Sequence, residues 1–401
     1  DDRLNVLWNE VGALDGVDIV DQDIYLQIEG AAGEKLLLYT DLDRLEKHMA
    51  EISPADAALC KEFVDAIRQY PAIAGIRLVR IGMRAFASDF QNPFLREAIS
   101  MIGNVGFFLM TMNSYSRRDA GWPIGGSLEL ARRMEKRFLK LGGVIKYKAR
   151  VEEIVIESGR ATGVSLADGK FHTADFVISA ADGYATIYRM LQGKYVDDAI
   201  NDLYTNAKTA ATSVQVSLGI GCDLSDEPHD VVVKLDTPIT MMGAEKSHIA
   251  IKHYCYDKSL SPKGKSVVTS LVPCDFEYWR ALSEDKSAYT AEKEKLAAAF
   301  IQVVEKRFPR TRGKVEVSDV ATPMTYSRYT GAWKGAYMGW LSTPERPVTS
   351  APDTLPGLEE FYMAGQWTYP SGGLPIALVT ARKTMQKLCA QDGRAFVSRT
   401  K

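Results

Sequence analysis

The sequence predicts a mixed α/β protein in which two domains are interleaved along the chain. The chain has 401 residues, 46% hydrophobic and 25% charged, which is ordinary globular composition at a length that usually exceeds one hydrophobic core. Short strand-like runs alternate with helical stretches along the whole chain. Near the C-terminus an apolar strand leads into a glycine-rich loop and then a helix, an order typical of α/β ligand sites.

The first 115 residues mix short strands with helices. Residues 24–28 and 35–40 flank a glycine-containing turn and predict a hairpin. Ser53 and Pro54 predict the N-cap and first position of a helix, whose apolar stripe comprises Leu59, Phe63, Ala66 and Ile67. The longest apolar run, residues 105–112, predicts a buried strand or a turn of a core helix, because a membrane-spanning helix needs about 18 residues or more.

The stretch from residue 121 to 181 reads as a turn, a helix and several short strands. The helix opens at residues 124–127, and Gly142 with Gly143 ends it as a left-handed C-cap. Its apolar residues fall on one face: Leu128, Ala131, Met134, Phe138 and Leu141. Strands are expected at residues 144–150, 153–157, 161–166, 170–173 and 175–181.

A second run of mixed elements follows from residue 184 to about 325. Strands are predicted near residues 213–219, 230–235, 249–254 and 266–272, and a long amphipathic helix at residues 289–308. The last block, residues 360–389, predicts a strand, a glycine-rich loop and a helix.

Charge and cysteine usage exclude several classes of function. A formal net charge of -2 gives no basic field for phosphate contacts, so we expect no nucleic-acid partner. The five cysteines are scattered without a C-x-x-C pair, which indicates neither a disulfide framework nor a zinc site and favours a reducing cytoplasm. The N-terminal residues lack the pattern of a signal peptide. His248 and His253 lie five apart on a predicted strand and point to opposite faces, so no metal site is expected.

The C-terminal block carries the clearest chemical pattern. Its strand ends at Gly365, and the loop 371–373 contains Gly372 and Gly373 before a helix that starts near Leu374 and Pro375. Glycines let a ligand approach the backbone, and the positive end of a helix stabilises negative charge. Such charge develops at the N1/O2 edge of a reduced flavin.

Taken together, the motifs resemble those of the phytoene desaturase-like family in the amine oxidase superfamily. They are P-x-G-G at residues 123–126, a V-x-x-I strand with a D-G turn at 151–169, A-D-x-V-I-S-A-A at 174–181, T-P-x-T-x-x-R-Y at 322–329 and A-G-Q-W…G-G-x-P at 364–375. The resemblance covers essentially the whole chain. That family includes carotenoid desaturases, carotenoid isomerases and retinol saturase-like proteins.

The resemblance implies an FAD cofactor in a Rossmann-like FAD-binding domain, interleaved with a mixed-sheet substrate domain. The implied cofactor-binding residues are Pro123, Gly125, Gly126, Val151, Ala180, Gly365, Gln366, Gly372, Gly373, Leu374 and Pro375. It divides the chain into residues 1–115 and 184–325 for the substrate domain, and residues 116–183 and 326–401 for the FAD-binding domain.

Two departures from the family pattern stand out. Gln366 occupies a position where many members carry an acid, and its neutral amide can still bond ribityl or phosphate oxygens. No G-x-G-x-x-G opens a β-α-β unit, although family members begin with one. We therefore expect that the chain as given omits the segment with the dinucleotide-binding unit.

The expected function is FAD-dependent hydride transfer to or from an apolar carotenoid, isoprenoid or lipid-like substrate, in a cytoplasmic protein. Contact with a membrane surface and the oligomeric state stay open. The alternatives are an amine oxidase-like flavoenzyme and a non-catalytic scaffold that has lost FAD binding. The catalytic residue is unassigned. The substrate-side candidates are aromatic and basic residues near the C-terminal third: Tyr326, Arg328, Tyr329, Trp333 and Tyr337.

Overall fold

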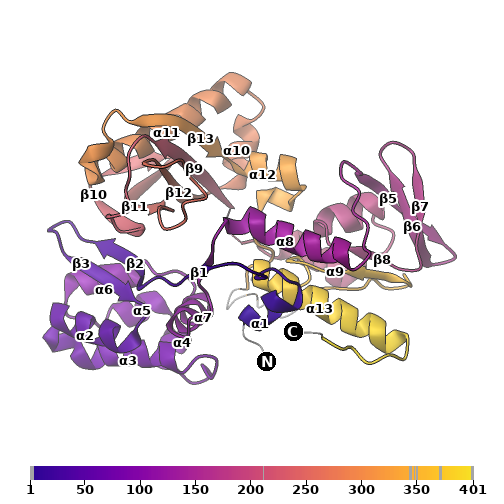
Figure 1. The fold of residues 1–401 in the computed structure, drawn as a ribbon, viewed down its shortest axis with the longest axis horizontal. Helices are drawn as coiled ribbons and strands as arrows, with labels where there is room; N and C mark the ends of the chain where they lie inside the picture. The colour runs from indigo at the N-terminus through magenta and orange to yellow at the C-terminus, as the bar shows by residue number, and fades with distance from the viewer. Residues whose placement is uncertain are drawn as a thin grey trace.

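The computed structural model describes residues 4–210, 212–342, 346, 348, 351–369 and 373–398. The molecule is elongated, and two lobes lie side by side along its longest axis (Figure 1). One lobe holds the large sheet and the helices α2 to α7, and the other holds α8, α9, α13 and the small strands β5 to β8. The fold is of the mixed α/β class expected from the sequence.

A seven-stranded mixed sheet forms the centre of the first lobe. All its neighbours pair antiparallel except β10 and β2, which run parallel. The order is β13 (Val315–Ala321), β9 (Thr212–Ile220), β12 (Ser266–Cys274), β11 (Ala244–His253), β10 (Asp230–Met241), β2 (Ile24–Glu29) and β3 (Lys35–Tyr39). The hairpin and all four predicted strands of the second segment are confirmed. The sheet therefore joins the two segments that we predicted as substrate domain.

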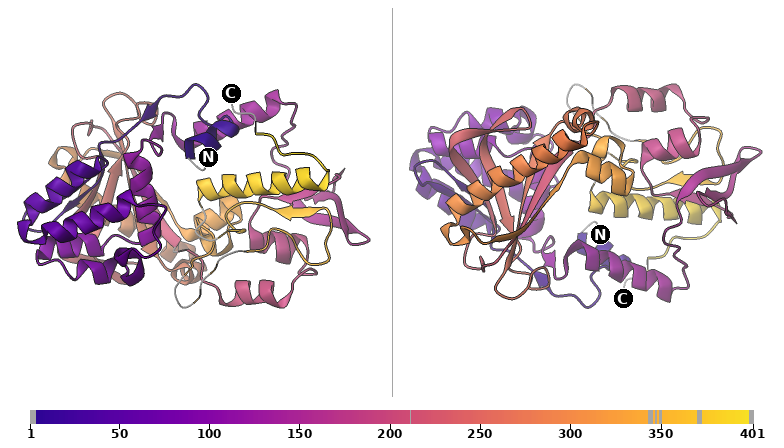
Figure 2. Two further views of the ribbon diagram at one scale, coloured as in Figure 1. Left: turned by 90° about the horizontal axis from the view of Figure 1, so that it is seen from below. Right: turned by 90° about the horizontal axis from the view of Figure 1, so that it is seen from above.

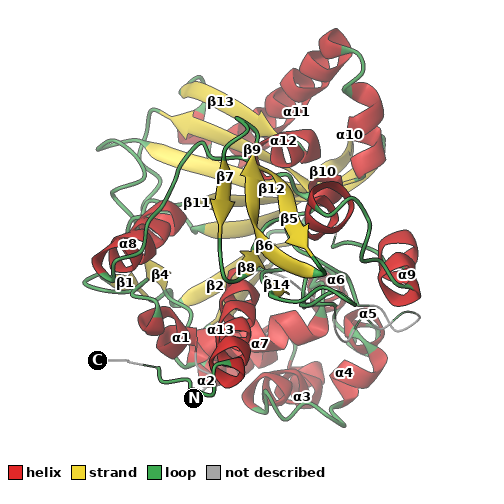
Figure 3. Ribbon diagram, turned by 90° about the vertical axis from the view of Figure 1, so that its right-hand side faces the viewer, coloured by secondary structure: helices red, strands yellow, loops and turns green. Residues whose placement is uncertain are grey.

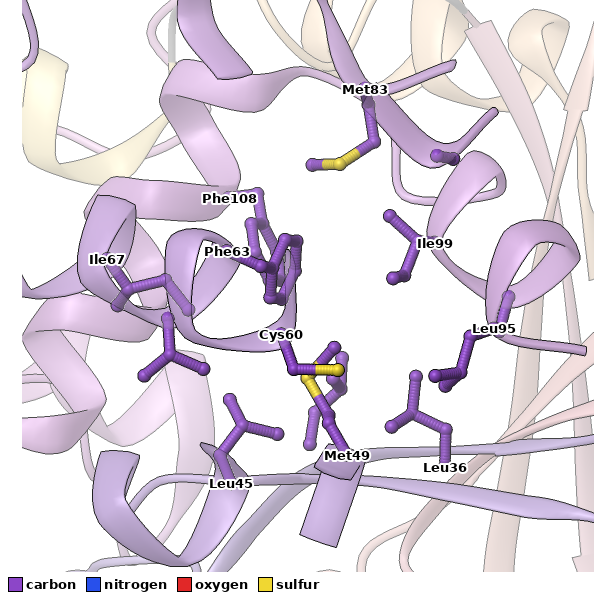
Figure 4. Packing of buried hydrophobic residues seen from close by; sticks show 14 of the residues in the cluster. Leu36, Leu45, Met49, Cys60, Phe63, Ile67, Met83, Leu95, Ile99 and Phe108 are labelled. Atoms are coloured by element: carbon purple, nitrogen blue, oxygen red, sulfur yellow. The ribbon is translucent and has the colours of Figure 1, made fainter. Parts of the chain in front are cut away.

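Helices between residues 42 and 116 pack against the β2–β3 end of the sheet. They are α2 (Leu42–Ile52), α3 (Ala57–Arg68), α4 (Arg77–Ile81), α5 (Met83–Ala87), α6 (Pro93–Ser100) and α7 (Val105–Ser116). The tilted rings of Phe63 and Phe108 pack against each other in their shared core, with Leu45, Met49 and Cys60 around them (Figure 4). The apolar run at residues 105–112 is thus a core helix. Pro54 begins a single 3-10 turn before α3, and Ser53 Oγ donates to Asp56 instead of capping the backbone.

The opposite end of the sheet is covered by a second helical layer. Helices α10 (Phe276–Leu282) and α11 (Lys286–Arg307) bury Trp279, Phe300 and Val304 against β9 to β13. The long helix predicted at residues 289–308 is confirmed. The apolar alternation of β9 supplies the facing residues Val214, Val216 and Leu218.

The second lobe is built on two small sheets, whose strands lie in front of the large sheet in the view of Figure 3. β5 (Val151–Glu157), β6 (Arg160–Leu166) and β7 (Phe171–Thr173) pair antiparallel, and β8 (Val177–Ser179) pairs in parallel with β14 (Phe361–Met363). α9 (Asp198–Asn206) and the π-helical turn Ala185–Met190 pack into the core of this lobe with Trp340 and Trp367. By packing, residues 185–207 therefore lie with this lobe, whereas we had assigned them to the substrate domain.

Helix α13 (Leu374–Gln391) runs through the middle of the second lobe. Figure 2 shows it between α8 (Gly126–Lys140) on one side and α9 on the other. The short helix α1 (Leu4–Glu10) is tied to α13 by an ion pair between Arg382 Nε and Glu10 Oε2 at 3.0 Å. β1 (Ile19–Val20) pairs with β4 (Trp122–Pro123) where the chain passes between the lobes. Among the described residues, no helix is long and apolar enough to cross a membrane.

In this lobe one predicted strand is absent, and one predicted helix exposes the face that we expected to be buried. Residues 144–150 form no strand, because no neighbouring described strand pairs with them; Val144 and Tyr147 are exposed. Helix α8 forms as predicted, and Gly142 takes the left-handed conformation at its end. Its apolar face is nevertheless mostly exposed, since Leu128 and Leu141 face solvent and Leu130 is the buried leucine.

Candidate functional site

A cavity of about 500 Å³ opens where β8 and β14 end and α13 begins. Such a volume lies in the range of small-molecule sites, and the carboxyl edge of a parallel pair is where α/β folds bind ligands. The residues that line it are Ala180, Ala181, Asp182, Thr330, Ala332, Tyr337, Met338, Gly365, Gln366, Trp367, Gly373, Leu374 and Ala377.

Parallel pairing of β8 with β14 creates this edge. Met363 faces Ser179 in the register, and Ala364 N donates to Ser179 O at 2.9 Å. Both strands therefore end together, and the backbone after each turns into the cavity wall. Ser179 Oγ is itself bonded to Thr186 Oγ1 at 2.7 Å, which satisfies the buried hydroxyl.

Two glycines keep the wall open at the turn into α13. Gly365 has a φ of 104°, and its N–H donates to Thr380 Oγ1 of α13 at 2.8 Å. Gly373, with a φ of 87°, precedes the first residue of the helix. A side chain at Gly373 would meet only Pro375 Cδ, at 3.9 Å, so the cradle beside the helix is open space that glycine leaves free.

The first turn of α13 gives this wall a positive partial charge. Gly373, Leu374 and Ala377 all line the cavity, and no side chain of the described residues caps the helix. The N–H groups of the first turn and the helix dipole favour an electron-rich ligand edge here. This arrangement fits the charge that a reduced flavin carries.

Asp182 connects two walls of the cavity. Its carboxylate is buried and accepts hydrogen bonds from Ala185 N and Trp333 N, each at 2.8 Å. Burial raises the pKa of Asp182, and the two backbone donors lower it less. The side chain thereby fixes the stretch around Ala332 against the end of β8.

The third wall depends on a close approach of two backbone segments. A Cβ at Gly339 would lie 2.1 Å from Gln366 O, so only glycine fits there. Trp340 Nε1 donates to Trp367 O at 3.0 Å, and the two indole rings pack edge to face at 5.3 Å. Gln366 and Trp367 are thus held in place by the segment that also supplies Tyr337 and Met338.

Five of the predicted cofactor residues line this cavity: Ala180, Gly365, Gln366, Gly373 and Leu374. Pro375 lies in the first turn of α13 without reaching the wall. Gly372 lies outside the described residues. The sequence motif at residues 364–375 therefore contributes most of one side of the cavity.

Other predicted cofactor residues lie elsewhere. Val151 begins β5, and Pro123, Gly125 and Gly126 lie where β4 leads into α8, so the described cavity wall includes none of them. Gly125 N donates to Asp257 Oδ2 at 2.8 Å, which fixes this turn against the first lobe.

The substrate-side candidates are also dispersed. Tyr337 lines the cavity, whereas Trp333 stacks on Tyr184 at 5.5 Å with an interplanar angle of 4°. Tyr329 is exposed, with Arg328 over its ring at 4.7 Å. Tyr326 is half-buried, and burial raises its pKa.

Sequence reasoning missed several wall residues. Asp182 directly follows the A-D-x-V-I-S-A-A motif, and Trp367 ends the A-G-Q-W motif, so a place in or beside a motif was the available signal. Thr330, Ala332 and Met338 carry no comparable signal, because tertiary folding alone brings them to the wall.

Another cavity, of about 420 Å³, lies between β10 and α11. Arg307 in its wall is paired with Glu29, with Nε to Oε2 at 2.8 Å, and Lys306 is paired with Asp236. It contains none of the predicted site residues. Among the described residues, no group of three or more His, Cys, Asp or Glu is placed to hold a metal ion.

Comparison with known proteins identifies the family. The model of the family described as "Flavin containing amine oxidoreductase" matches residues 56–388. A prolycopene isomerase of Arabidopsis thaliana is 25% identical over 282 residues, covering 69% of this chain and 47% of the relative. A lycopene-forming phytoene desaturase of Paracoccus sp. is 23% identical over 444 residues, covering 96% of this chain and 85% of the relative. The chain spans about half the length of the prolycopene isomerases it matches.

Solved structures agree on the fold. An oxidoreductase from Methanosarcina mazei superposes with a TM-score of 0.56 at 16% identity, over 92% of this chain and 82% of that one. A putrescine oxidase double mutant gives a TM-score of 0.55 at 12% identity, over 97% and 86%. The family match confirms the expected flavin cofactor, FAD. With the family model spanning most of its length, the chain belongs to the flavin-containing amine oxidoreductases.

Proposed function

We propose that the protein is an FAD-dependent oxidoreductase that moves a hydride between flavin and an apolar, polyene or isoprenoid-like substrate. The observation that carries the proposal is the cavity at the start of α13, where glycine backbone and a helix N-terminus meet mostly apolar walls. The similarity to a prolycopene isomerase and to phytoene desaturases supports the choice of substrate class.

The residues present fit the cofactor. Gly365 and Gly373 leave room for a ring or chain against the backbone, and the amide of Gln366 offers both a donor and an acceptor. Leu374 and Ala377 present the positive end of α13. When bound, a flavin supplies the hydride acceptor and donor chemistry.

The remaining wall residues hold the walls of the cavity in position and shield its interior from water. Met338 and Trp367 are apolar groups that exclude water from the cavity, and a dry site strengthens every polar contact within it. Asp182 acts through the backbone: its two accepted hydrogen bonds hold the wall around Ala332 in position.

An amine oxidase-like reaction is the second candidate. The shared fold with a putrescine oxidase and the rings of Trp333, Trp340 and Trp367 favour it. Those rings pack edge to face in the core, however, and do not form two parallel walls of a cage. Asp182, the acid in the described wall, is engaged by two backbone donors and has a raised pKa, which makes it a poor partner for a cationic amine.

The test is anaerobic mixing of the FAD-loaded protein with phytoene or prolycopene in liposomes, with putrescine in buffer as the comparison. We expect the flavin band at about 450 nm to bleach or shift with a polyene and to stay unchanged with putrescine. Liposomes without polyene are the control. Bleaching by putrescine alone would replace this proposal with the amine oxidase reaction, and no change with any compound would favour a non-catalytic relative.

A further inference from the structure

A cluster of polar and aromatic side chains, here called the tyrosine–lysine cluster, lies where the large sheet meets β4. Strands β2, β10 and β11, helix α7, the turn after β11 and β4 contribute to it, and β4 pairs with β1, which lies between the two lobes in Figure 1. All its members are half-buried: Tyr25, Tyr115, Trp122, His229, Asp230, Lys252, Tyr254 and Tyr256. None of them lines the cavity at the start of α13.

An ion pair lies at the centre of the cluster. Asp230 and Lys252 face each other across β10 and β11, with Lys252 Nζ 3.0 Å from Asp230 Oδ2. Burial lowers the pKa of Lys252, but the facing carboxylate raises it more, so the ammonium stays charged. The lysine side chain remains 35% exposed, which leaves its other N–H groups within reach of a ligand.

Three tyrosine hydroxyls around the pair lack a hydrogen-bond partner among the described residues. Within the described part of the chain, the hydroxyls of Tyr25, Tyr115 and Tyr256 form no hydrogen bond. Burial raises the pKa of all three, to about 12 for Tyr25, so each stays protonated and able to donate. None of the three hydroxyl oxygens is among the fully buried atoms that lack a partner, so solvent or a ligand oxygen can reach them.

The cluster adjoins the segment that the family resemblance places beside the flavin. Trp122 Nε1 and Gly125 N both donate to Asp257 Oδ2 at 2.8 Å. The Trp122 ring lies 5.5 Å from the Tyr254 ring and 5.7 Å from the Tyr256 ring. The aromatic rings of Trp122, Tyr254 and Tyr256 therefore join that segment to the cluster.

We propose that the tyrosine–lysine cluster binds a neutral oxygen group, a carbonyl or hydroxyl, at one end of an otherwise apolar substrate. This inference rests on the proposed function, which gives the substrate its apolar remainder. The phenol hydroxyls and the Lys252 ammonium donate to the oxygen. Because Asp230 and Lys252 neutralise each other, a charged head group would lose hydration here without gaining a net counter-charge, whereas a carbonyl or hydroxyl oxygen loses less hydration and still accepts from the donors.

The experiment is calorimetric titration of the purified protein with three probes that share a ten-carbon chain: 2-decanone, decanoate and decylammonium. We expect 2-decanone to bind at least about tenfold more tightly than either ion. Equal affinities, or a preference for an ion, would overturn the proposal.

Single Tyr→Phe substitutions test whether the probe binds at the tyrosine–lysine cluster. Y25F, Y115F and Y256F each remove one hydroxyl and keep the ring, and each should weaken 2-decanone about 2- to 10-fold, the range expected for one hydrogen bond. Y147F is the matched control, since Tyr147 is exposed and lies outside both the cluster and the predicted site residues, and it should bind as the parent does. Melting curves show whether each variant folds, and each single variant is compared separately with the control. Unchanged binding in all three folded variants would refute the assignment.

Flavin absorbance recorded on the same samples separates this inference from the proposed function. Selective 2-decanone binding by a protein that takes up no FAD would keep the inference as a binding site and remove the enzymatic role. Normal flavin uptake with unselective probe binding would overturn the inference alone.

Discussion

At the scale of single residues, the sequence indicated chemistry best where backbone geometry demands a particular residue. Gly365 and Gly373 were assigned from the C-terminal motif, and both have left-handed φ values at the cavity. Asp182 lies directly after a motif, but its role could not be assigned, because that role depends on a hydrogen bond donated by Trp333 N, 151 residues away in the chain. Contacts of that separation leave no local sequence pattern.

Gly339 provides a residue-scale prediction. G339A places a methyl group 2.1 Å from Gln366 O and forces the two segments apart, so we expect weaker FAD retention and a free energy of unfolding lower by about 1 to 3 kcal/mol. Equilibrium dialysis and urea unfolding measure the two effects. G103A is the control, because a Cβ at Gly103 meets nothing within 4 Å, and it should change neither quantity appreciably. Full FAD retention by G339A would contradict the close approach.

His229 provides a pH prediction. Burial, with Lys252 and His253 nearby, lowers its pKa from 6.5 to about 4. Between these values the unfolded chain binds a proton that the folded protein does not, so stability is lost as pH falls from about 6.5 toward 4, by up to about 3 kcal/mol. H229Q should show a flatter dependence over this window. Urea unfolding of both proteins from pH 7 to 4.5 measures the difference, and identical slopes would exclude the burial of a neutral His229.

At the scale of elements, periodicity identified helices and strands but not always which face is covered. Helix α8 forms where its apolar period and glycine cap predict it, yet the leucines on the predicted face are largely exposed. Residues 144–150 have strand composition and form no strand, since a strand needs a neighbour to satisfy its backbone groups. Pattern alone cannot reveal the presence of that neighbour.

The orientation of α8 can be tested with a matched pair of leucines. Leu141 is 77% exposed and Leu130 is 8% exposed. We expect L141K to change the free energy of unfolding by less than about 0.5 kcal/mol and L130A to lower it by about 2 kcal/mol or more. Denaturant unfolding compares them. A large loss with L141K and a small one with L130A would mean that the helix is turned the other way.

At the scale of the whole molecule, one sheet joins segments that are distant in the chain. β2 and β10 pair in parallel although some two hundred residues separate them, and ion pairs support the junction: Lys234 Nζ to Glu97 Oε2 at 2.7 Å and Arg307 Nε to Glu29 Oε2 at 2.8 Å. The interleaving of the two predicted substrate segments was inferred from the family resemblance and not from these residues. Neither the family resemblance nor the sequence pattern predicted that residues 185–207 pack with the second lobe, because short helices carry little information about the elements they pack against.

The central claim is that the cavity at the start of α13 holds a flavin. Its most direct test is the visible absorption spectrum of the protein, expressed from its natural gene, loaded with FAD and desalted. The account predicts bands near about 370 and 450 nm that persist after desalting and weaken in G339A. A spectrum without these bands would contradict the account and would leave a member of the family that keeps the fold without the cofactor.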